Sequence, residues 1–326
     1  MDKNSQTPIL EVKNLKQYFY PSRKFTVKAV DGISFKIMPG ETYGLVGESG
    51  SGKSTTGRAI IRLYDPTDGQ IIFEGEDITG KMSNKALKTL RTKMAMIFQD
   101  PMTALNPVKT VGEQIAEVIR LHQKCTREES KKKACEMLEA VGIEARRADE
   151  YPHQFSGGMK QRVVIAIALA CEPQILLADE PTTALDVTIQ AQVIEMMIEL
   201  RRRYQMSIIF ITHDLGIVAE VCDKVAIMYA GEIVEYGALK DIFLATSHPY
   251  TKGLFGSIPS LTKDVDRLEP IEGMTPNPAQ LPSGCKFHPR CPYATEACSV
   301  DVPEAIEVSP GHFVRCHLCK SEGDKA

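Results

Sequence analysis

The feature that most constrains this chain is the glycine-rich stretch GESGSGKST at residues 47–55. It fits the phosphate-loop pattern G-x-x-x-x-G-K-[ST] at every fixed position. Residues 43–46 before it form an apolar segment typical of a short buried strand, and residues 56–63 after it have a helical pattern. A strand, this loop and a helix in that order predict an α/β fold with a phosphate-binding turn.

The residue types of this loop indicate its chemistry. Glycines let the backbone curl so that several N–H groups converge on the phosphates, and the helix that follows adds a favourable field for anions. We expect Lys53 to reach the β- and γ-phosphates and the Ser54 hydroxyl to ligate Mg²⁺. A glycine-rich turn without a ligand is the alternative. The full set of expected nucleotide contacts in the loop is Gly47, Ser49, Gly50, Ser51, Gly52, Lys53, Ser54 and Thr55.

Composition narrows the setting in which the loop works. The 326 residues are enough for one large or two ordinary domains, and 43% of them are apolar. The longest uninterrupted apolar run covers residues 163–171, whereas a membrane-spanning helix needs about 20 such residues. The polar start of the chain has no signal-peptide pattern, so we expect synthesis in the cytosol. A net charge of −3 gives no electrostatic reason to expect nucleic acid as a partner.

The first hundred residues have strand patterns around the loop. Residues 9–12 suggest an edge strand, residues 26–38 a second strand, and residues 94–98 a core strand ending at Gln99. The aromatic cluster at residues 18–20 has two open interpretations. It could stack on a nucleotide base, or it could pack inside a β-subdomain.

Between about residues 100 and 158 the pattern becomes helical, with apolar residues three and four apart in 110–121 and 127–141. The stretch Ser156-Gly157-Gly158 then opens a strongly apolar helix to about residue 170. Ser156 is a plausible N-cap, and the glycines expose the first backbone N–H groups. This helix start is therefore predicted to be a second anion site.

Two later strands end in residues suited to catalysis. Residues 175–178 predict a buried strand that leads into Asp179 and Glu180, and residues 208–212 predict a core strand followed by His213. One interpretation of the acidic pair is purely structural, as a capped turn. Beside a phosphate loop, the first acid is expected to hold the metal through water and the second to polarise the attacking water.

Residues 225–229 and 232–236 indicate a hairpin.

The order of these motifs resembles the ATP-binding subunits of ABC transporters over about residues 9–245. The resemblance implies a RecA-like P-loop NTPase core with an antiparallel β-subdomain and a helical insert in an ATP-binding domain, residues 1–245. It also implies roles for single residues. Gln99 would sense the Mg²⁺ and γ-phosphate region and bind the metal, Glu180 would be the general base, and His213 would contact the γ-phosphate. Phe19 would stack on adenine, with Tyr18 as its rival.

The same resemblance implies partners. Ser156, Gly157 and Gly158 would bind the γ-phosphate of a nucleotide held by a second ATPase subunit, which gives a head-to-tail dimer, with a paralogue favoured as the other half. Two transmembrane permease subunits and, indirectly, a substrate-binding protein would complete a complex at the cytoplasmic face of the inner membrane. One departure is Met159, where the family usually has Gln. Because backbone N–H groups and Ser156 should carry the phosphate contacts, activity is still expected.

Residues 246–326 resemble the small, irregular C-terminal extension of oligopeptide/dipeptide importer ATPases, in particular at 248–251, 285–293 and 311–316. The resemblance implies an ATP-hydrolysing motor of a bacterial importer of di- or oligopeptides, and relatives that carry nickel or sugars leave the substrate open. Two rival functions remain. One is a soluble ABC ATPase of iron–sulfur assembly or translation, and the other is a regulatory subunit with weak catalysis, which Met159 suggests.

Five of the nine cysteines fall between residues 285 and 319. In a reducing cytosol such a cluster suggests a metal rather than disulfides. By resemblance to relatives with a [4Fe–4S] cluster on such a tail, the expected ligands are Cys285, Cys291, Cys298 and Cys316. Zinc and unligated thiols are the alternatives. The remaining cysteines are expected to be small buried apolar residues: Cys125, Cys135, Cys171 and Cys222.

Overall fold

A computed structural model describes residues 7–22, 25–183, 185–256 and 271–319 of the chain. These residues form two compact units. Unit 1 contains residues 38–42 and 80–211, and unit 2 contains residues 7–37, 43–79 and the part of the chain after residue 211. Within the described residues, no helix combines the length and the apolar character needed to cross a membrane.

The core of unit 1 is a set of parallel strands in the order β8-β7-β6, with β6 at Met94–Ile97, β7 at Ile175–Asp179 and β8 at Ser207–Thr212. Every residue of β7 and β8 is buried. Strands covered on both faces have continuous apolar runs, as these two do. Since parallel strands run in one direction, their carboxyl ends meet at one edge, where residues after β6 and β7 can act together.

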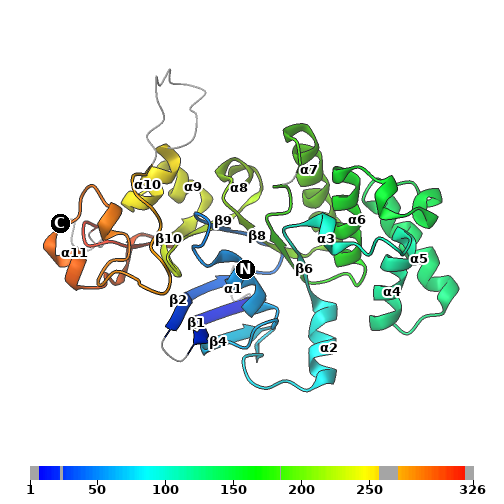
Figure 1. Ribbon diagram of the computed structural model, residues 1–326, viewed down its shortest axis with the longest axis horizontal. Helices are drawn as coiled ribbons and strands as arrows, with labels where there is room; N and C mark the ends of the chain where they lie inside the picture. The colour runs from blue at the N-terminus through cyan, green and yellow to red at the C-terminus, as the bar shows by residue number, and fades with distance from the viewer. Residues whose placement is uncertain (1–6, 23–24, 184, 257–270, 320–326) are drawn as a thin grey trace, which may run out of the picture. The chain divides into compact units, whose positions relative to one another are not determined.

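The helices of unit 1 begin where their capping residues predict. Capping boxes at Thr110 and Thr126 start α4 (Val111–His122) and α5 (Arg127–Ala140), which pack against each other and against α6 (Gly157–Leu169) (Figure 1). The helices expected at 110–121 and 127–141 are thus confirmed to within one residue. The unit also contains the helices α2 (Asn84–Lys93), α3 (Pro101–Ala104) and α7 (Val187–Tyr204), with short 3-10 turns at Ala145–Asp149 and Pro152–Gln154.

Unit 2 begins with an antiparallel sheet in the order β2-β1-β4-β5, from β1 (Leu10–Ser22), β2 (Phe25–Ile37), β4 (Asp68–Phe73) and β5 (Glu76–Asp77) (Figure 1). The sequence predicted an edge strand at residues 9–12. A strand is present there, but the prediction that it lies at the edge of the sheet was wrong. Leu10 faces Ile37 on one side and Phe73 on the other, so β1 is an interior strand. Register shifts interrupt β1 after Val12 and hide its full length from a simple alternation pattern.

The second sheet of unit 2 has the order β11-β12-β10-β9-β3. Strand β3 (Thr42–Val46) runs parallel to β9 (Lys224–Tyr229), and β10 (Glu232–Ala238) forms the expected hairpin with β9. Strands β11 (Ala305–Ser309) and β12 (His312–Arg315) extend it from the C-terminal part of the chain. The short helices are α1 (Lys53–Ile60), α8 (Leu215–Val221), α9 (Leu239–Leu244), α10 (Pro249–Gly256), α11 (Glu296–Val300) and a 3-10 turn at His288–Arg290.

The sequence did not predict β11 and β12. Because β12 pairs with β10 through Glu235 and Val314, the extension is joined to the preceding chain by main-chain hydrogen bonds. The domain boundary at residues 245/246 stays a prediction.

Candidate nucleotide site

The phosphate loop lies in unit 2 between β3 and α1, as expected. Two of its glycines are required by the backbone. A Cβ on Gly47 would lie 2.2 Å from the Met228 carbonyl oxygen, and one on Gly52 would lie 2.3 Å from the Ala29 carbonyl oxygen. Gly52 also has φ +102°, a left-handed conformation that glycine adopts at no steric cost. The loop can therefore be built only with glycine at these two positions.

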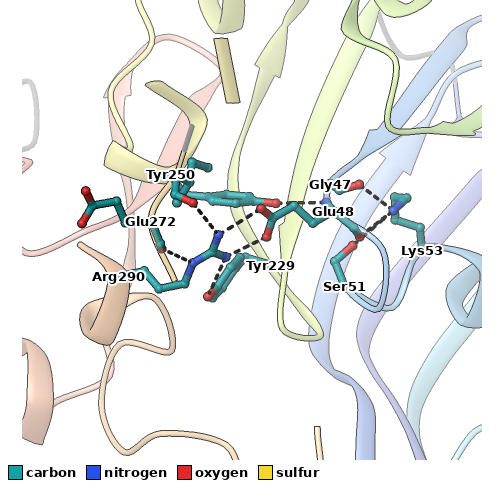
Figure 2. A network of polar contacts seen from close by, with 9 residues as sticks. Gly47, Glu48, Ser51, Lys53, Tyr229, Tyr250, Glu272 and Arg290 are labelled. Atoms are coloured by element: carbon teal, nitrogen blue, oxygen red, sulfur yellow. Dashed lines mark hydrogen bonds and ion pairs between the residues drawn. The ribbon is translucent and has the colours of Figure 1, made fainter. Parts of the chain in front are cut away.

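Lys53 lies inside the curl of this loop. Its Nζ is 2.6 Å from the Gly47 carbonyl oxygen and 2.8 Å from that of Glu48 (Figure 2). The loop is tied by its own backbone, since the Ser51 N–H donates to Glu48 O at 3.2 Å. Lys53 is buried and begins helix α1, so a cation and a helix N-terminus coincide here. This donor set fits the phosphates of a nucleotide, and the next residue in the chain, Ser54, carries a hydroxyl oxygen of the kind that Mg²⁺ takes as a ligand.

In unit 1 the structure brings together two residues predicted from separate motifs. The Gln99 side-chain amide donates to Glu180 Oε2 at 2.8 Å, and the Thr183 hydroxyl donates to the same oxygen at 3.1 Å. Gln99 and Glu180 follow the carboxyl ends of the neighbouring strands β6 and β7. The two residues are 81 positions apart in the chain, and the parallel pairing of these strands brings them together in space.

The backbone of Glu180 is also unusual. Its φ of +48° lies in the left-handed region, which non-glycine residues adopt at a cost of about 1–3 kcal/mol and which is common at functional sites. Its N–H donates to the Ile211 carbonyl oxygen at 2.8 Å, which fixes this turn. The preceding residue, Asp179, is completely buried at the end of β7. The chain thus turns sharply between the two acids and separates their side chains into different environments.

The expected second anion site has the predicted local structure. Ser156 is the N-cap of α6, and its hydroxyl oxygen accepts from the Met159 N–H at 3.4 Å. Gly158 allows helix α7 to approach, because a Cβ there would lie 2.4 Å from a methyl carbon of Ile189. The neighbouring Gly157 has no such close contact.

The structure gives Met159 a local packing role. Its sulfur accepts from the Arg147 guanidinium at 3.3 Å, and Arg147 also lies over the Phe155 ring at 4.3 Å. Arg147 is held in turn by Glu150 at 2.7 Å. The side chain that departs from the usual family residue therefore packs on the preceding segment of unit 1.

His213 and the two aromatic candidates lie in unit 2. His213 is exposed directly after β8, next to Asp214, which caps α8. Phe19 packs edge-on against Tyr64 with ring centroids 5.3 Å apart, and the Tyr18 hydroxyl donates to Asp31. Burial and this hydrogen bond raise the pKa of Tyr18. Both aromatics thus have packing partners in the β-subdomain, and the adenine contact stays a prediction.

The four cysteines predicted as metal ligands fold into one extension. The Cys285 N–H donates to Cys298 O at 2.8 Å. Burial, with smaller contributions from Cys298, Cys316 and Cys291, raises the pKa of the Cys285 thiol to about 11. Cys319, which the sequence left without a role, donates a hydrogen bond to Cys316 and lowers its pKa. Across the described ranges, however, no group of three or more His, Cys, Asp or Glu side chains is arranged to hold a metal ion.

The other cysteines differ partly from expectation. Cys222 is buried and packs against Gly44. The remaining ones are only partly buried, so the expectation of buried apolar residues was wrong for Cys125, Cys135 and Cys171. Cys125 precedes α5 and Cys171 follows α6, whereas Cys135 lies within α5.

Sequence reasoning missed the residues that support the loop from the C-terminal extension. Arg290 forms an ion pair with Glu48, and the Tyr250 hydroxyl accepts from the Glu48 N–H at 3.0 Å (Figure 2). A signal for them existed in the sequence. Glu48 is a carboxylate inside an anion-binding loop, and a cation from elsewhere in the chain would favour its charged form there.

Comparison with known proteins agrees with these motifs. The pattern of the ABC transporter family matches residues 30–183, and that of the oligopeptide/dipeptide transporter C-terminal region matches residues 234–298. The oligopeptide transport ATP-binding protein AppD of Bacillus subtilis is 49% identical, covering 97% of this chain and 98% of that protein. The dipeptide transport ATP-binding protein DppD of the same organism is 48% identical, with 98% and 97% covered.

Solved structures agree on the fold. The ATP-binding cassette MJ0796, a dimer in a post-hydrolysis state bound to ADP and phosphate, is 29% identical with a TM-score of 0.65. The similarity covers 71% of this chain and 98% of that one. The α/β fold of P-loop NTPases predicted from the loop is thereby confirmed. AppD and DppD are 49% and 48% identical to this chain along nearly its whole length. The chain therefore belongs to the ATP-binding subunits of the oligopeptide/dipeptide family of ABC transporters.

Proposed function

We propose that this chain is the ATP-hydrolysing motor subunit of an importer for di- or oligopeptides. The observation that carries the proposal is similarity to oligopeptide and dipeptide transport ATP-binding proteins along nearly the whole chain, including the C-terminal region. The contact between Gln99 and Glu180 adds a catalytic arrangement. It favours the motor over a regulatory subunit with weak catalysis, since the proposed base accepts a hydrogen bond from a side-chain amide that would orient it.

Within the nucleotide site, each residue has a proposed role. Lys53 and the loop N–H groups bind the β- and γ-phosphates, and Ser54 and Gln99 are Mg²⁺ ligands, with Asp179 acting through water. When bound, the metal supplies charge neutralisation on the transferring phosphoryl group. Glu180 accepts a proton from the attacking water. At the same time the water oxygen bonds to the γ-phosphorus, and the bond from the γ-phosphorus to the β,γ-bridging oxygen breaks. Gln99 and Thr183 keep Glu180 Oε2 in a fixed orientation for this step.

The signature at Ser156, Gly157 and Gly158 is proposed to act on a nucleotide bound by a second ATPase subunit, with His213 contacting the γ-phosphate. The cassette MJ0796, similar to this chain, is described as a dimer. A paralogous second ATPase subunit and two permease subunits would complete the transporter complex. In this complex, ATP binding closes the ATPase dimer and hydrolysis reopens it. In this proposal the chain works at the cytoplasmic face of the inner membrane.

Purification from membranes tests this function. Tagged full-length chain, isolated in mild detergent, should carry along two polytopic membrane proteins and a second ATPase subunit in stoichiometric amounts. ATP turnover of the complex, reconstituted in vesicles, should increase when peptide and its binding protein are added. Recovery of only soluble partners, with no peptide response, would contradict the import role and leave the ATPase standing.

A separate proposal concerns the cysteines of the extension. We propose that Cys285, Cys291, Cys298 and Cys316 take up a [4Fe–4S] cluster, with zinc as the alternative; four cysteine thiolates are the usual donor set for either. Support comes from the fold of the extension, in which the Cys285 N–H donates to the Cys298 carbonyl oxygen at 2.8 Å. Such a group would stabilise an extension with few apolar residues.

Anaerobic purification followed by iron, sulfide and zinc analysis tests this proposal. We expect about four iron and four sulfide per chain in the wild type, and loss of both in Cys291→Ala. Cys125→Ala, outside the extension, is the matched control and should keep the full content. Zinc in place of iron would support the alternative, and the absence of both elements would refute the metal site without affecting the ATPase assignment.

A further inference from the structure

Arg290 of the C-terminal extension forms an ion pair with Glu48 of the phosphate loop. Its two terminal nitrogens lie 2.7 Å and 3.1 Å from the two carboxylate oxygens of Glu48 (Figure 2). This is the forked geometry in which a guanidinium binds a carboxylate most strongly. The partners are 242 positions apart in the chain, so a distant segment has been folded onto the loop.

The surroundings of Arg290 hold its side chain rigidly. Only 6% of the side chain is exposed. Its Nε donates to the Glu272 carbonyl oxygen at 2.9 Å, and a terminal nitrogen contacts the Tyr229 hydroxyl at 3.4 Å. The guanidinium also lies 5.8 Å from the Tyr229 ring centroid. A long side chain that is already ordered loses little further entropy on holding Glu48, which strengthens the pair.

Glu48 needs such a partner because of where it sits. It is the second residue of the loop, and its carbonyl oxygen contacts Lys53, the cation expected to bind the phosphates. An uncompensated carboxylate here would repel an entering polyphosphate and could compete for Lys53. Its N–H is directed to the Tyr250 hydroxyl at 3.0 Å, so Glu48 is fixed through both its backbone and its side chain.

We propose that Arg290 is a positioning residue of the nucleotide site, which neutralises and orients Glu48 so that the loop accepts phosphate. It touches no nucleotide itself and acts through Glu48. The segment that carries it is anchored a second time, because Lys286 Nζ lies 3.0 Å from Asp31 and 3.1 Å from Glu232. The fold of this segment, which runs from Cys285 to Cys291, therefore sets the affinity of the loop. The inference rests on the ATP-binding role of that loop.

Binding of a fluorescent ATP analogue to the full-length chain tests the proposal. Arg290→Gln should raise the dissociation constant about tenfold, because the carboxylate of Glu48 is left uncompensated. Arg290→Lys keeps the charge without the fork and should weaken binding about threefold. In steady-state assays the Arg290→Gln effect should appear in KM, with kcat within about twofold. Glu304→Gln, at an exposed position of the same extension, is the control and should bind as the wild type.

A double-mutant cycle separates this role from a general effect on folding. Glu48→Gln alone should bind within about twofold of the wild type, and adding Arg290→Gln to it should cost no more than about twofold again. An equal loss in both backgrounds would show that Arg290 acts through the fold of the extension and would overturn the proposal. Unchanged binding by a folded Arg290→Gln would overturn it as well. Failure of the wild type to bind the analogue would instead contradict the ATPase role.

Discussion

Replacement of Glu180 by glutamine will lower kcat for ATP hydrolysis by about 10²- to 10⁴-fold, the usual contribution of a general base. Glutamine has nearly the same shape, and its carbonyl oxygen can accept the hydrogen bonds that Gln99 and Thr183 donate at 2.8 and 3.1 Å. The amide cannot take a proton from water at neutral pH, so the chemical step alone is lost. The measurement is phosphate release by the assembled complex, alongside binding of an ATP analogue, which should stay within about twofold of the wild type.

Glu172 provides a matched control for this experiment. It is a second glutamate of unit 1 with a left-handed backbone, at φ +51°, but it is exposed and lies outside every predicted motif. Glu172→Gln should leave turnover unchanged. If Glu180→Gln turned over as fast as the wild type, hydrolysis would take place only at the partner subunit's site, and the proposed base would be rejected.

The catalytic part of the site could be predicted from sequence because its determinants are local. The loop pattern fixes Gly47 and Gly52, whose backbone leaves no space for a Cβ. The acids at 179 and 180 follow an apolar strand, and the convergence of parallel strands is a general property of α/β sheets. That rule places Gln99 beside Glu180, as found. The roles assigned to these residues remain predictions for the experiments above.

The parts that escaped prediction depend on contacts distant in sequence. Strand β1 was expected to lie at an edge because four residues cannot reveal which strands flank them, and its register shifts break the alternation beyond Val12. The pairing of β12 with β10 and the ion pair of Arg290 with Glu48 join positions far apart in the chain. Periodicity and capping report only on neighbours within a few turns, so they contain no information about such pairs.

The carboxylate of Glu235 is expected to be the strongest single anchor of the extension. The side chain is fully buried, and it accepts from the Ser247 N–H at 2.8 Å, the His248 N–H at 3.1 Å and the His312 ring at 2.8 Å. Glu235→Ala leaves the His248 N–H and the His312 ring buried without this acceptor, and the partly buried Ser247 N–H loses it too. We therefore expect a loss of about 3–5 kcal/mol in the free energy of unfolding, as for other broken buried networks. Urea unfolding followed by circular dichroism measures this loss.

The effect of Glu235→Ala should extend to nucleotide binding, because a chain of hydrogen bonds leads from it to the loop. Burial lowers the pKa of His248 to about 4, so its neutral ring can accept from the Tyr250 N–H at 3.0 Å. Tyr250 in turn accepts from the Glu48 N–H. Glu235→Gln, which keeps one oxygen, should lose about half as much stability, and Glu220→Ala, at an exposed helical position, should lose almost none. A loss below about 1 kcal/mol in Glu235→Ala would show that main-chain pairing of β10 with β12 holds the extension without this carboxylate.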